Sequence, residues 1–487
     1  MSIAIAVDQG TTSSRAIAFK ADGTIVASHS QPLACHYPHP GWVEQDANEL
    51  WQGQRHCLQF LVENHDLDGQ QQFSVGITNQ RETTIIWDAT TGIPIGPAIV
   101  WQCRRSASYC DALDFKQKLM IREKTGLVAD AYFSATKIRW LLDNIEGAQA
   151  LAEQGQLRFG TVDTWLMWNL SDGQSHITDA TNASRTMLYN IHQHCWDNEL
   201  LALFNIPASL LPEVVASGGL HCTFEHQGKQ LQFGAIIGDQ QAALYGQECT
   251  EAGLAKNTYG TGCFMLMHTG NQAIESNHGL LTTVALNSDG SNGYALEGSV
   301  FMAGATMQWL RDELGIIADL QESSEIAAGL ESNLGVYLIP AFTGMGAPHW
   351  QQDCSASIVG LTRGSNKNHL IRAGLESIAH QSADVIAAMT NDLHSVIKTL
   401  KVDGGASNNE FLMQFQADLL DCQVIKPYVS EITAFGAAKL AALSLGQWQS
   451  EQINIEINNR YQPKLDAVKV RTLRHEWLRA LQHCLNY

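Results

Sequence analysis

The chain of 487 residues lacks any apolar run close to the ~20 residues that a helix needs to cross a bilayer. Its amino terminus has no basic region, and its first apolar run breaks at Asp8, so we expect no signal peptide and no membrane insertion. Basic residues are scarce, because 30 Lys and Arg stand against 49 Asp and Glu, a formal net charge of −19. Nucleic acids and anionic membranes attract basic surfaces, so this charge argues against either partner.

Cysteine-pairing motifs are absent as well. The eleven cysteines are scattered, odd in number and never spaced as C-x-x-C, which indicates reduced thiols in the cytoplasm. His36 and His39 lie in a proline-rich loop, and His192, His194 and Cys195 have no partner cluster in the sequence. We therefore interpret these histidines as surface residues and not as metal ligands.

Two common nucleotide-binding motifs are missing. The sequence contains no G-x-x-x-x-G-K-[ST], because residues 227–229 and 436–439 lack both the upstream spacing and the Ser or Thr. It also contains no G-x-G-x-x-G after a strand-like segment. A Walker-type NTPase and a dinucleotide-dependent dehydrogenase are therefore disfavoured.

The composition that remains is typical of a well-buried enzyme. Apolar residues make up 45% and charged residues 16%, and a chain of this length should divide into two large domains. Strand-like segments at 73–78, 84–87 and 98–101 alternate with helical ones at 47–62 and 135–144. This alternation predicts an α/β domain with a mixed sheet.

The opening segment combines a strand, a glycine turn and polar side chains. Residues 3–7 turn at Asp8-Gln9-Gly10 into a run of hydroxyls, Arg15 and a second strand at 16–19. An aspartate at the tip of a buried strand can hold Mg²⁺, often through water. The amides and hydroxyls of residues 10–14 can donate to phosphate oxygens, and Arg15 adds a positive fork. An ordinary polar hairpin has the same pattern, so this segment alone does not decide between the two.

The second half of the chain repeats this layout. Residues 253–267 again form strand, Gly-Thr-Gly turn and strand, without an acidic residue at the tip. Asp403-Gly404-Gly405 lies between a strand and a helix at 410–420, where glycines permit close backbone approach and a helix start favours an anion. We therefore predict duplicated domains, 1–248 and 249–487, that share one nucleotide in the cleft between them.

These three elements resemble the two phosphate motifs and the adenosine motif of the actin-like ATPase superfamily. Within it, residues 132–140 (YFSATKIRW) resemble the first signature of the FGGY carbohydrate kinases, and residues 357–364 with 369–376 resemble the second. The resemblance runs essentially from end to end of the chain. It implies an α/β fold of two duplicated ribonuclease H-like, actin-like domains with a central cleft.

Longer blocks narrow this resemblance to one branch of the family. They are similar to the branch that phosphorylates glycerol, and they read GITNQRETTIIW, IVWQCRR, GTVDTWLMW, TNASRTML, GDQQAAL and KNTYGTGCFMLM. The resemblance implies ATP-dependent phosphorylation of glycerol to sn-glycerol 3-phosphate, with Mg²⁺ as cofactor. It also implies a cytoplasmic enzyme that assembles as a homodimer or homotetramer.

Phosphoryl transfer to an alcohol needs a base for the hydroxyl proton. The resemblance assigns this role to Asp239, which follows an apolar strand and a glycine and can therefore point into a cleft. Because Asp239 also precedes a helical segment at 240–246, it could equally be a helix N-cap. The two roles are compatible.

The substrate contacts follow from the same resemblance. It implies that glycerol is held by Arg81, Glu82, Tyr132, Asp239 and Gln240 against an aromatic wall of Trp101 and Phe264. Arg81 and Glu82 are neighbours, which point to opposite faces of an extended chain, so both reach one substrate only if the chain turns after Gln80. Elsewhere such an Arg-Glu pair is more often solvated, and the aromatic residues could be ordinary core.

The nucleotide contacts implied by the resemblance fall into two sets. Those to the phosphates come from Thr11, Thr12, Ser13, Arg15, Gly260 and Thr261. Those to adenosine come from Gly304, Gln308, Gly405 and Asn409. The block 407–411 departs slightly from the family pattern around Asn409. Mg²⁺ is assigned to Asp8, with Asp239 as a second contact.

Two other hypotheses stay open. Another FGGY kinase would act on a ketose or a pentitol, but residues 79–83 with Trp101 are typical of the glycerol branch, and a bulkier sugar needs a different wall. An actin-like or chaperone-like ATPase would keep the phosphate hairpins and have no use for a polyol clamp.

Overall fold

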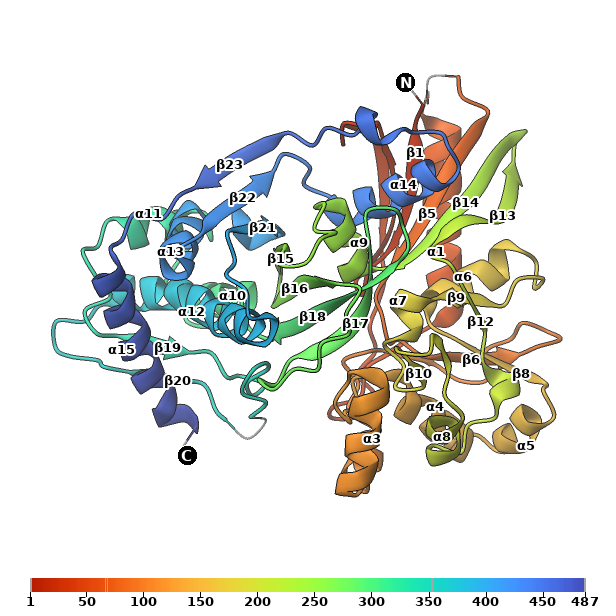
Figure 1. Ribbon diagram of the computed structural model, residues 1–487, viewed down its shortest axis with the longest axis horizontal. Helices are drawn as coiled ribbons and strands as arrows, with labels where there is room; N and C mark the ends of the chain where they lie inside the picture. Colours follow the sequence, from red (N-terminus) through yellow and green to blue (C-terminus); the bar gives the residue numbers. More distant parts are fainter. Residues whose placement is uncertain (1, 66, 68, 352–353, 486–487) are drawn as a thin grey trace.

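The computed structural model describes residues 2–65, 67, 69–351 and 354–485. It consists of two lobes, each built around one large mixed sheet, and the two ends of the chain lie in different lobes (Figure 1). Among the residues described, no helix is both long and apolar enough to cross a membrane.

The sheet of the first lobe has the strand order β13-β14-β5-β1-β2-β3. β1 is parallel to β5 and β5 is parallel to β14, whereas the other neighbours are antiparallel. The strands are β1 (Ala4–Gln9), β2 (Ser13–Phe19), β3 (Ile25–Pro32), β5 (Gln72–Asn79), β13 (Gly218–His226) and β14 (Lys229–Gly238). The helices that follow them are α1 (Ala47–Asn64), α6 (Val162–Leu170) and α9 (Asp239–Gly246).

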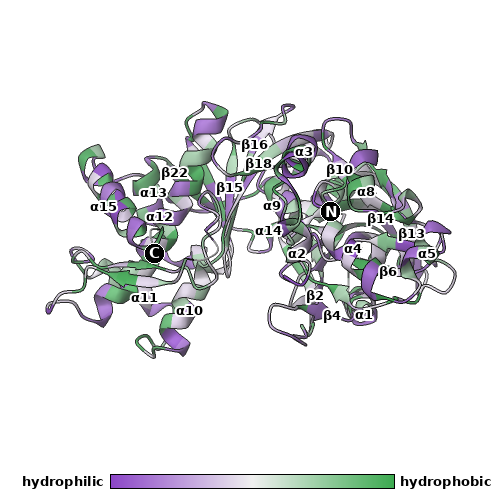
Figure 2. Cartoon of the chain, turned by 90° about the horizontal axis from the view of Figure 1, so that it is seen from below, coloured by the Kyte–Doolittle hydropathy of each residue, from purple (hydrophilic) through white to green (hydrophobic). Residues whose placement is uncertain are grey.

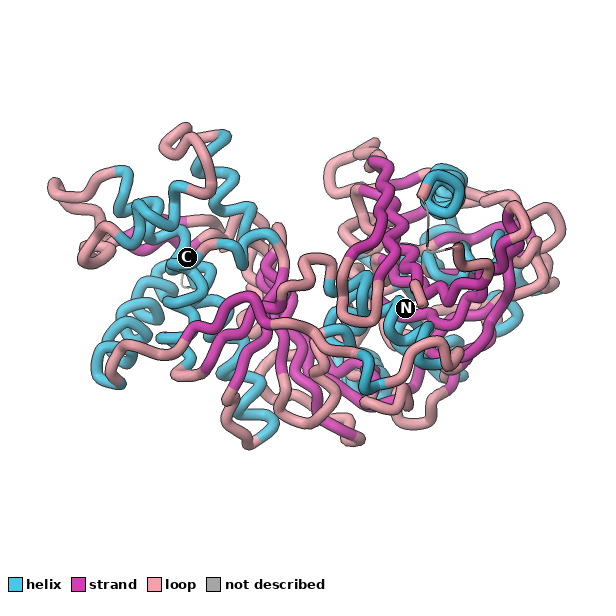
Figure 3. The backbone as a smooth tube through the Cα atoms, turned by 90° about the horizontal axis from the view of Figure 1, so that it is seen from above, coloured by secondary structure: helices cyan, strands magenta, loops and turns pink. Residues whose placement is uncertain are grey.

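The sheet of the second lobe has the order β17-β18-β16-β15-β21-β22-β23. Its strands are β15 (Ala255–Tyr259), β16 (Cys263–Gly270), β17 (Leu281–Leu286), β18 (Asn292–Val300), β21 (Thr399–Asp403), β22 (Gln423–Pro427) and β23 (Ile457–Tyr461). The helices between them are α12 (Lys367–Leu393), α13 (Glu410–Leu420) and α14 (Ile432–Ser444). Figure 3 shows this sheet and the first one as two separate groups of strands.

Five strands of each sheet share one plan. The series β18-β16-β15-β21-β22 repeats β3-β2-β1-β5-β14 with the same parallel and antiparallel neighbours. The helices also correspond, because α12, α13 and α14 follow the same strands as α1, α6 and α9. The predicted fold class, a duplicated α/β architecture, is confirmed.

Alternate residues of β1 serve the two faces of the first sheet. Ile5 packs with α1 and α6, whereas Ala4 and Ala6 pack under α14. Small residues on this second face let α14 come close: a Cβ on Gly76 of β5 would lie 2.1 Å from the Ala437 carbonyl oxygen. β1 is therefore covered on both faces, which explains why its sequence is continuously apolar.

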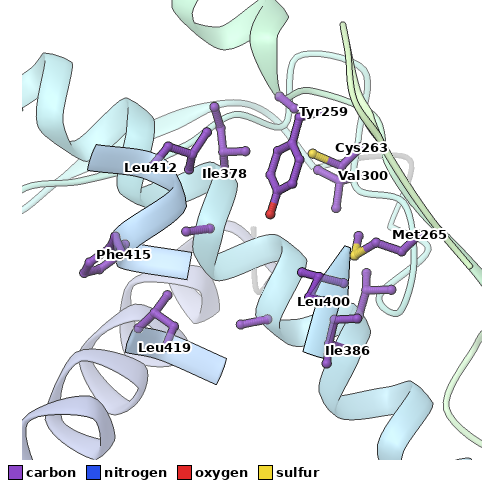
Figure 4. Close-up of a cluster of buried hydrophobic side chains, with 14 of the residues drawn as sticks. Tyr259, Cys263, Met265, Val300, Ile378, Ile386, Leu400, Leu412, Phe415 and Leu419 are labelled. Carbon is purple, nitrogen blue, oxygen red and sulfur yellow. The ribbon is translucent and has the colours of Figure 1, made fainter. Parts of the chain in front are cut away.

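The second hairpin rests on the core of its own lobe. Figure 4 shows Tyr259 and Cys263 of the hairpin together with Ile378 of α12 and Leu412 of α13. The Tyr259 hydroxyl donates to Gln416 Oε1 at 2.7 Å, so the strand tip is tied to α13 as well as packed on it. The Gly-Thr-Gly turn therefore sits on a rigid base.

The remaining elements surround the two sheets. In the first lobe they are β4 (Glu44–Gln45), β6 (Ile85–Asp88), β7 (Ala98–Ile99), α2 (Ala107–Asp111), α3 (Phe115–Thr125), α4 (Ser134–Asn144), α5 (Ala148–Glu153), β8 (Leu157–Gly160), β9 (Ile177–Asp179), α7 (Ala180–Ala183), β10 (Tyr189–Asn190), β11 (Cys195–Trp196), α8 (Asn198–Leu203), η1 (Ala208–Leu210) and β12 (Glu213–Val215). In the second they are α10 (Gly304–Asp312), α11 (Glu322–Ala328), β19 (Tyr337–Ile339), β20 (Ser357–Val359), η2 (Gly405–Asn408), η3 (Ser450–Gln452) and α15 (Ala467–Leu485). The strand predicted at 98–101 is shorter than expected, since only Ala98–Ile99 pair with β4.

Helices α9 and α14 cross where the lobes meet. α14 follows a strand of the second lobe but packs on the sheet of the first, and α9 lies against α14 and the strands β15–β17 (Figures 1 and 2). The crossing is tight, because a Cβ on Gly436 would lie 2.0 Å from the Ala242 carbonyl oxygen. A Cβ on Gly246 would lie 2.5 Å from the Ile432 carbonyl oxygen. Glycine at both positions is what allows the contact.

Gly436→Ala should therefore force the two helices apart. We expect a loss of about 1–3 kcal/mol in the free energy of unfolding, as for other overpacked sites, measured by urea denaturation. Gly364→Ala is the matched control, because its Cβ would have no neighbour closer than 3.5 Å, and it should change stability by less than ~0.5 kcal/mol. Equal stability of the two variants would contradict the close crossing.

Candidate active site

The candidate site residues of the first lobe gather at one edge of its sheet. The register places Gln9, Asn79 and Gly238 side by side, at the carboxyl ends of the parallel strands β1, β5 and β14. Asp8 lies at the end of the first of these strands, and Asp239 directly follows the third. Residues far apart in the sequence are thereby brought to one place, as is usual for the carboxyl ends of parallel strands.

The chain makes the sharp turn after β5 that the clamp hypothesis requires. Glu82 has a positive φ of 62°, and the Thr83 amide donates to the Arg81 carbonyl oxygen at 2.7 Å. Arg81 and Glu82 are only 3% and 1% exposed, so neither is a solvated loop residue. Arg81 Nε lies 3.2 Å from Asp239 Oδ1, which joins the predicted clamp to the predicted base.

Two further charged residues complete this cluster, and the sequence analysis missed both. Arg81 donates to the two carboxylate oxygens of Glu297 in β18, at 2.8 Å each. Arg185, just after α7, donates through Nε to Glu82 Oε1 at 2.7 Å and through Nη2 to Glu297 Oε1 at 3.1 Å. Burial alone would raise the pKa of Glu297, but Arg185 and Arg81 outweigh it and hold the pKa at about 2. Arg81, Glu82, Arg185 and Glu297 therefore form a ring of paired charges, called the buried ion ring below.

The sequence alone carries only weak signals that Arg185 and Glu297 belong to the site. Arg185 stands in the block TNASRTML, which could have marked it. Glu297 lies 216 positions from Arg81, in a strand with no motif of its own. Only the pairing of β18 with β16 brings it to the site.

Three aromatic side chains stand beside the buried ion ring. The Trp101 ring lies 5.6 Å from the Tyr132 ring and 6.3 Å from the Phe264 ring, measured between centroids, in edge-on arrangements. The Trp101 indole N–H donates to Thr11 Oγ1 at 3.0 Å, which ties the wall to the first hairpin. Burial and the nearby Glu82 raise the pKa of Tyr132, so its phenol stays neutral and can donate. The structure brings together the two residues of the predicted wall, Trp101 and Phe264, with Tyr132, the predicted hydroxyl contact.

The first hairpin presents polar groups around a buried carboxylate. Asp8 is 4% exposed and forms an ion pair with Arg15, whose Nη1 also lies 2.7 Å from Glu431 Oε2. Burial raises the pKa of Asp8, although Arg15 opposes the shift. Thr12 is exposed at the turn, and Thr11 and Ser13 are half-buried. Arg15 is thus already held by two carboxylates, and its predicted phosphate contact stays a prediction.

The second hairpin is in contact with two of the predicted adenosine segments. The Gly304 amide donates to the Gly260 carbonyl oxygen at 3.0 Å, and a Cβ there would lie 2.6 Å from that oxygen. Gly404 has a φ of +85°, and its Cβ would lie 2.5 Å from the Tyr259 carbonyl oxygen. Gly405 is exposed, with open space around it. The glycines therefore allow three backbone segments to meet at one place.

The other two predicted adenosine residues differ from each other. Gln308 is exposed on α10, four residues after Gly304 and hence on the same side of the helix. Asn409 caps α13, because its Oδ1 accepts from the Leu412 amide and its Nδ2 donates to Ser323 Oγ, both at 3.0 Å. Its side chain therefore has a structural role that the sequence analysis did not foresee.

The residues assigned to Mg²⁺ offer carboxylate oxygens. Within the described ranges, no three His, Cys, Asp or Glu side chains form a group that could hold a metal ion. Mg²⁺ in kinases needs no such group, since it is bound by one or two carboxylates with phosphate oxygens and waters. Asp8 and Asp239, at the carboxyl ends of β1 and β14 on either side of β5, are hard oxygen donors that suit this ion.

Comparisons with known proteins agree across the whole chain. Models of the FGGY family of carbohydrate kinases match residues 3–246 with the N-terminal domain and residues 255–445 with the C-terminal domain. The glycerol kinase of Shewanella pealeana is 52% identical over 483 residues, which cover 98% of each chain. The glycerol kinase of Shewanella baltica strain OS195 is 53% identical over 470 residues, which cover 95% of each chain.

Solved structures are similar in fold. The crystal structure of Plasmodium falciparum glycerol kinase with ADP has a TM-score of 0.92 at 33% identity and covers 100% of this chain and 98% of that one. A ligand-bound xylulose kinase from Lactobacillus acidophilus has a TM-score of 0.88 at 19% identity, covering 99% and 98%. At 19% identity, the match with xylulose kinase supports the fold and not the substrate.

The buried ion ring should be essential for stability. Glu297→Gln keeps the shape of the side chain but removes the carboxylate that Arg81 and Arg185 share, so we expect a loss of about 3 kcal/mol or more in the free energy of unfolding. The control is Glu199→Gln, since Glu199 pairs with Lys124 and its side chain is 71% exposed. Its effect should stay below ~1 kcal/mol. Equal losses in the two variants would refute the importance of the ring.

Proposed function

The chain belongs to the FGGY family of carbohydrate kinases, and on this basis we propose that it transfers the γ-phosphoryl group of ATP to glycerol in glycerol catabolism. The product is sn-glycerol 3-phosphate. The proposal rests on one observation: Arg81, which is predicted to hold the polyol, lies next to Asp239, the predicted base. Arg81 Nε is 3.2 Å from the Asp239 carboxylate, at the buried ion ring.

The clamp suits a small polyol. Arg81 donates to hydroxyl oxygens, Glu82 accepts hydroxyl protons, and Tyr132 and Gln240 add further polar contacts. Trp101 and Phe264 stand against the carbon backbone, where flat apolar rings pack well on C–H groups. Because Arg81 and Glu82 are already oriented by Glu297 and Arg185, binding costs little reorganisation of the clamp.

Asp239 is the proposed base. It begins α9, and its Oδ1 accepts from the Gln240 amide at 2.7 Å, which fixes the carboxylate at the helix start. Its side chain is 31% exposed, so a bound hydroxyl can reach it. Burial raises its pKa, which Arg81 and Lys256 oppose, and a raised pKa makes a carboxylate a better proton acceptor.

The nucleotide is proposed to bind between the two hairpins. Thr11, Thr12, Ser13 and Arg15 would donate to its phosphates from the first lobe, and Gly260 and Thr261 from the second. Adenosine would lie along Gly304, Gln308, Gly405 and Asn409. Mg²⁺, held by Asp8 and Asp239 with the phosphates, would neutralise phosphate charge.

The remaining assignments are proposals of the same kind. We place the division between the lobes at residues 248/249, between α9 and β15, in the interval that separates the two family models. We also propose that the protein is cytoplasmic, because ATP is supplied inside the cell. We propose a homodimer or homotetramer, as the family resemblance implies. The net charge of −19 does not suit a nucleic-acid partner.

A coupled assay tests the substrate. The purified protein with Mg²⁺-ATP should release ADP in the presence of glycerol and much more slowly with xylulose or a pentitol, because the aromatic wall leaves room for a small polyol. The reaction without any polyol is the control. Comparable ADP release without glycerol, or a clear preference for xylulose, would overturn the proposal.

Asp239→Asn tests the base. The change removes the proton acceptor and keeps the shape, so kcat should fall by about 100-fold or more while KM for ATP changes by less than ~3-fold. Asp111→Asn, at an exposed position at the end of α2, is the control and should leave kcat unchanged. If the Asp239 variant keeps a kcat near that of the wild type, another group is the base.

A further inference from the structure

Lys256 is a buried cation where the two lobes meet. It is 0% exposed, on strand β15 next to the crossing helix α9. Its ammonium has three protons, and each has an acceptor: Gln240 Oε1 at 2.5 Å, Thr258 Oγ1 at 2.9 Å and the Phe264 carbonyl oxygen at 3.2 Å. With all three protons engaged, it is placed to orient its neighbours.

The contact with Gln240 fixes the direction of the amide group. An ammonium only donates, so the Gln240 atom that it touches must be the oxygen. The amide nitrogen then points the other way and offers its two protons, and Gln240 is half-buried beside Asp239. Gln240 therefore presents donors, and no acceptor, to whatever lies beyond it.

The other two contacts of the ammonium lie within the second hairpin. The Phe264 carbonyl oxygen and Thr258 belong to the second hairpin, whereas Gln240 belongs to α9 at the end of the first lobe. The Phe264 ring lies 6.3 Å from the Trp101 ring. The Lys256 ammonium thus links Gln240 to β16, the strand that carries Phe264 of the aromatic wall.

The charges around Lys256 explain how a buried ammonium is tolerated. Asp239, Asp403 and Glu297 all lie near it and favour its charged form, although burial lowers its pKa to about 8. These carboxylates come from both lobes, so the cation also offsets negative charge where they meet.

We propose that Lys256 is a specificity-determining positioning residue: it orients Gln240 as a pure donor toward a substrate hydroxyl oxygen and holds Phe264 beside it. This inference rests on the proposed function, because glycerol supplies the hydroxyl. It concerns the polyol half of the site, so the nucleotide half should be unaffected.

The test is a double-mutant cycle with Lys256→Met, Gln240→Ala and the combination, all in the glycerol-dependent assay. Lys256→Met keeps most of the length of the unbranched side chain and removes the donor, so KM for glycerol should rise about tenfold or more, with KM for ATP within about twofold. If Lys256 acts through Gln240, the fold increase in KM for glycerol of the combined variant should be well below the product of the fold increases of the two single variants.

Two further variants separate this role from a loss of structure. Lys439→Met removes another buried lysine, which pairs with Glu248 at 3.4 Å, and should leave KM for glycerol within about twofold. Gln240→Glu keeps the acceptor for Lys256 but loses the donor to substrate, so it should raise KM for glycerol while keeping the melting temperature. If Lys256→Met does not fold, the Gln240→Glu variant still tests whether the Gln240 amide donates to the substrate.

The outcomes distinguish the inference from the proposed function. Additive effects in the cycle, equal rises in KM for glycerol and ATP, or a Gln240→Glu variant with an unchanged KM for glycerol would overturn the role of Lys256. A wild-type protein that does not phosphorylate glycerol would overturn the proposed function instead.

Discussion

The rest of the site depends on the buried pairing of Arg81 with Glu297. A guanidinium that is 3% exposed must have its charge matched, and Glu297 supplies two hydrogen bonds of 2.8 Å from the other lobe. The pairing fixes β18 against the turn after β5. The same turn orients Glu82, and the same guanidinium lies beside Asp239. This ion pair is thus one of the contacts that fix how the two lobes face each other at the proposed polyol site.

The crossing of α9 and α14 places the proposed base on the axis between the lobes. Asp239 is the first residue of α9, and the last, Gly246, meets α14 at backbone contact distance. A closing motion about this crossing would therefore shift the base little relative to the clamp, while the hairpins at 10–13 and 260–262 lie on different sheets and would move more. Such closure, which excludes water from phosphoryl transfer, stays a prediction.

The parts of the structure that the sequence predicts are those that depend on local sequence patterns. Strand-turn-strand segments with glycine tips were recognisable, and their repetition in the second half indicated the duplicated fold that the sheets show. The need for a turn after Gln80 also followed from the geometry of an extended chain, and Glu82 with its positive φ meets it. By contrast, Glu297 lies in a strand without a motif, and although Lys256 begins the block KNTYGTGCFMLM, only the folded structure reveals the partners of either residue. The capping role of Asn409 was hidden because asparagine suits a cap and a ligand contact equally well.

The charges of the site bear on the proposal that an anionic nucleotide binds there together with a metal ion. The charged groups described above include three buried cations, Arg81, Arg185 and Lys256, three buried carboxylates, Glu82, Glu297 and Asp403, and the half-buried Asp239. Their formal sum is one negative charge, and the cluster of Asp8, Arg15 and Glu431 adds another. The cations are engaged with these carboxylates or with fixed oxygens, so little positive charge is left for phosphates. In the proposed function, backbone amides of the two hairpins and a divalent ion would supply the positive charge that the side chains do not, so that a chain of net charge −19 could still hold ATP.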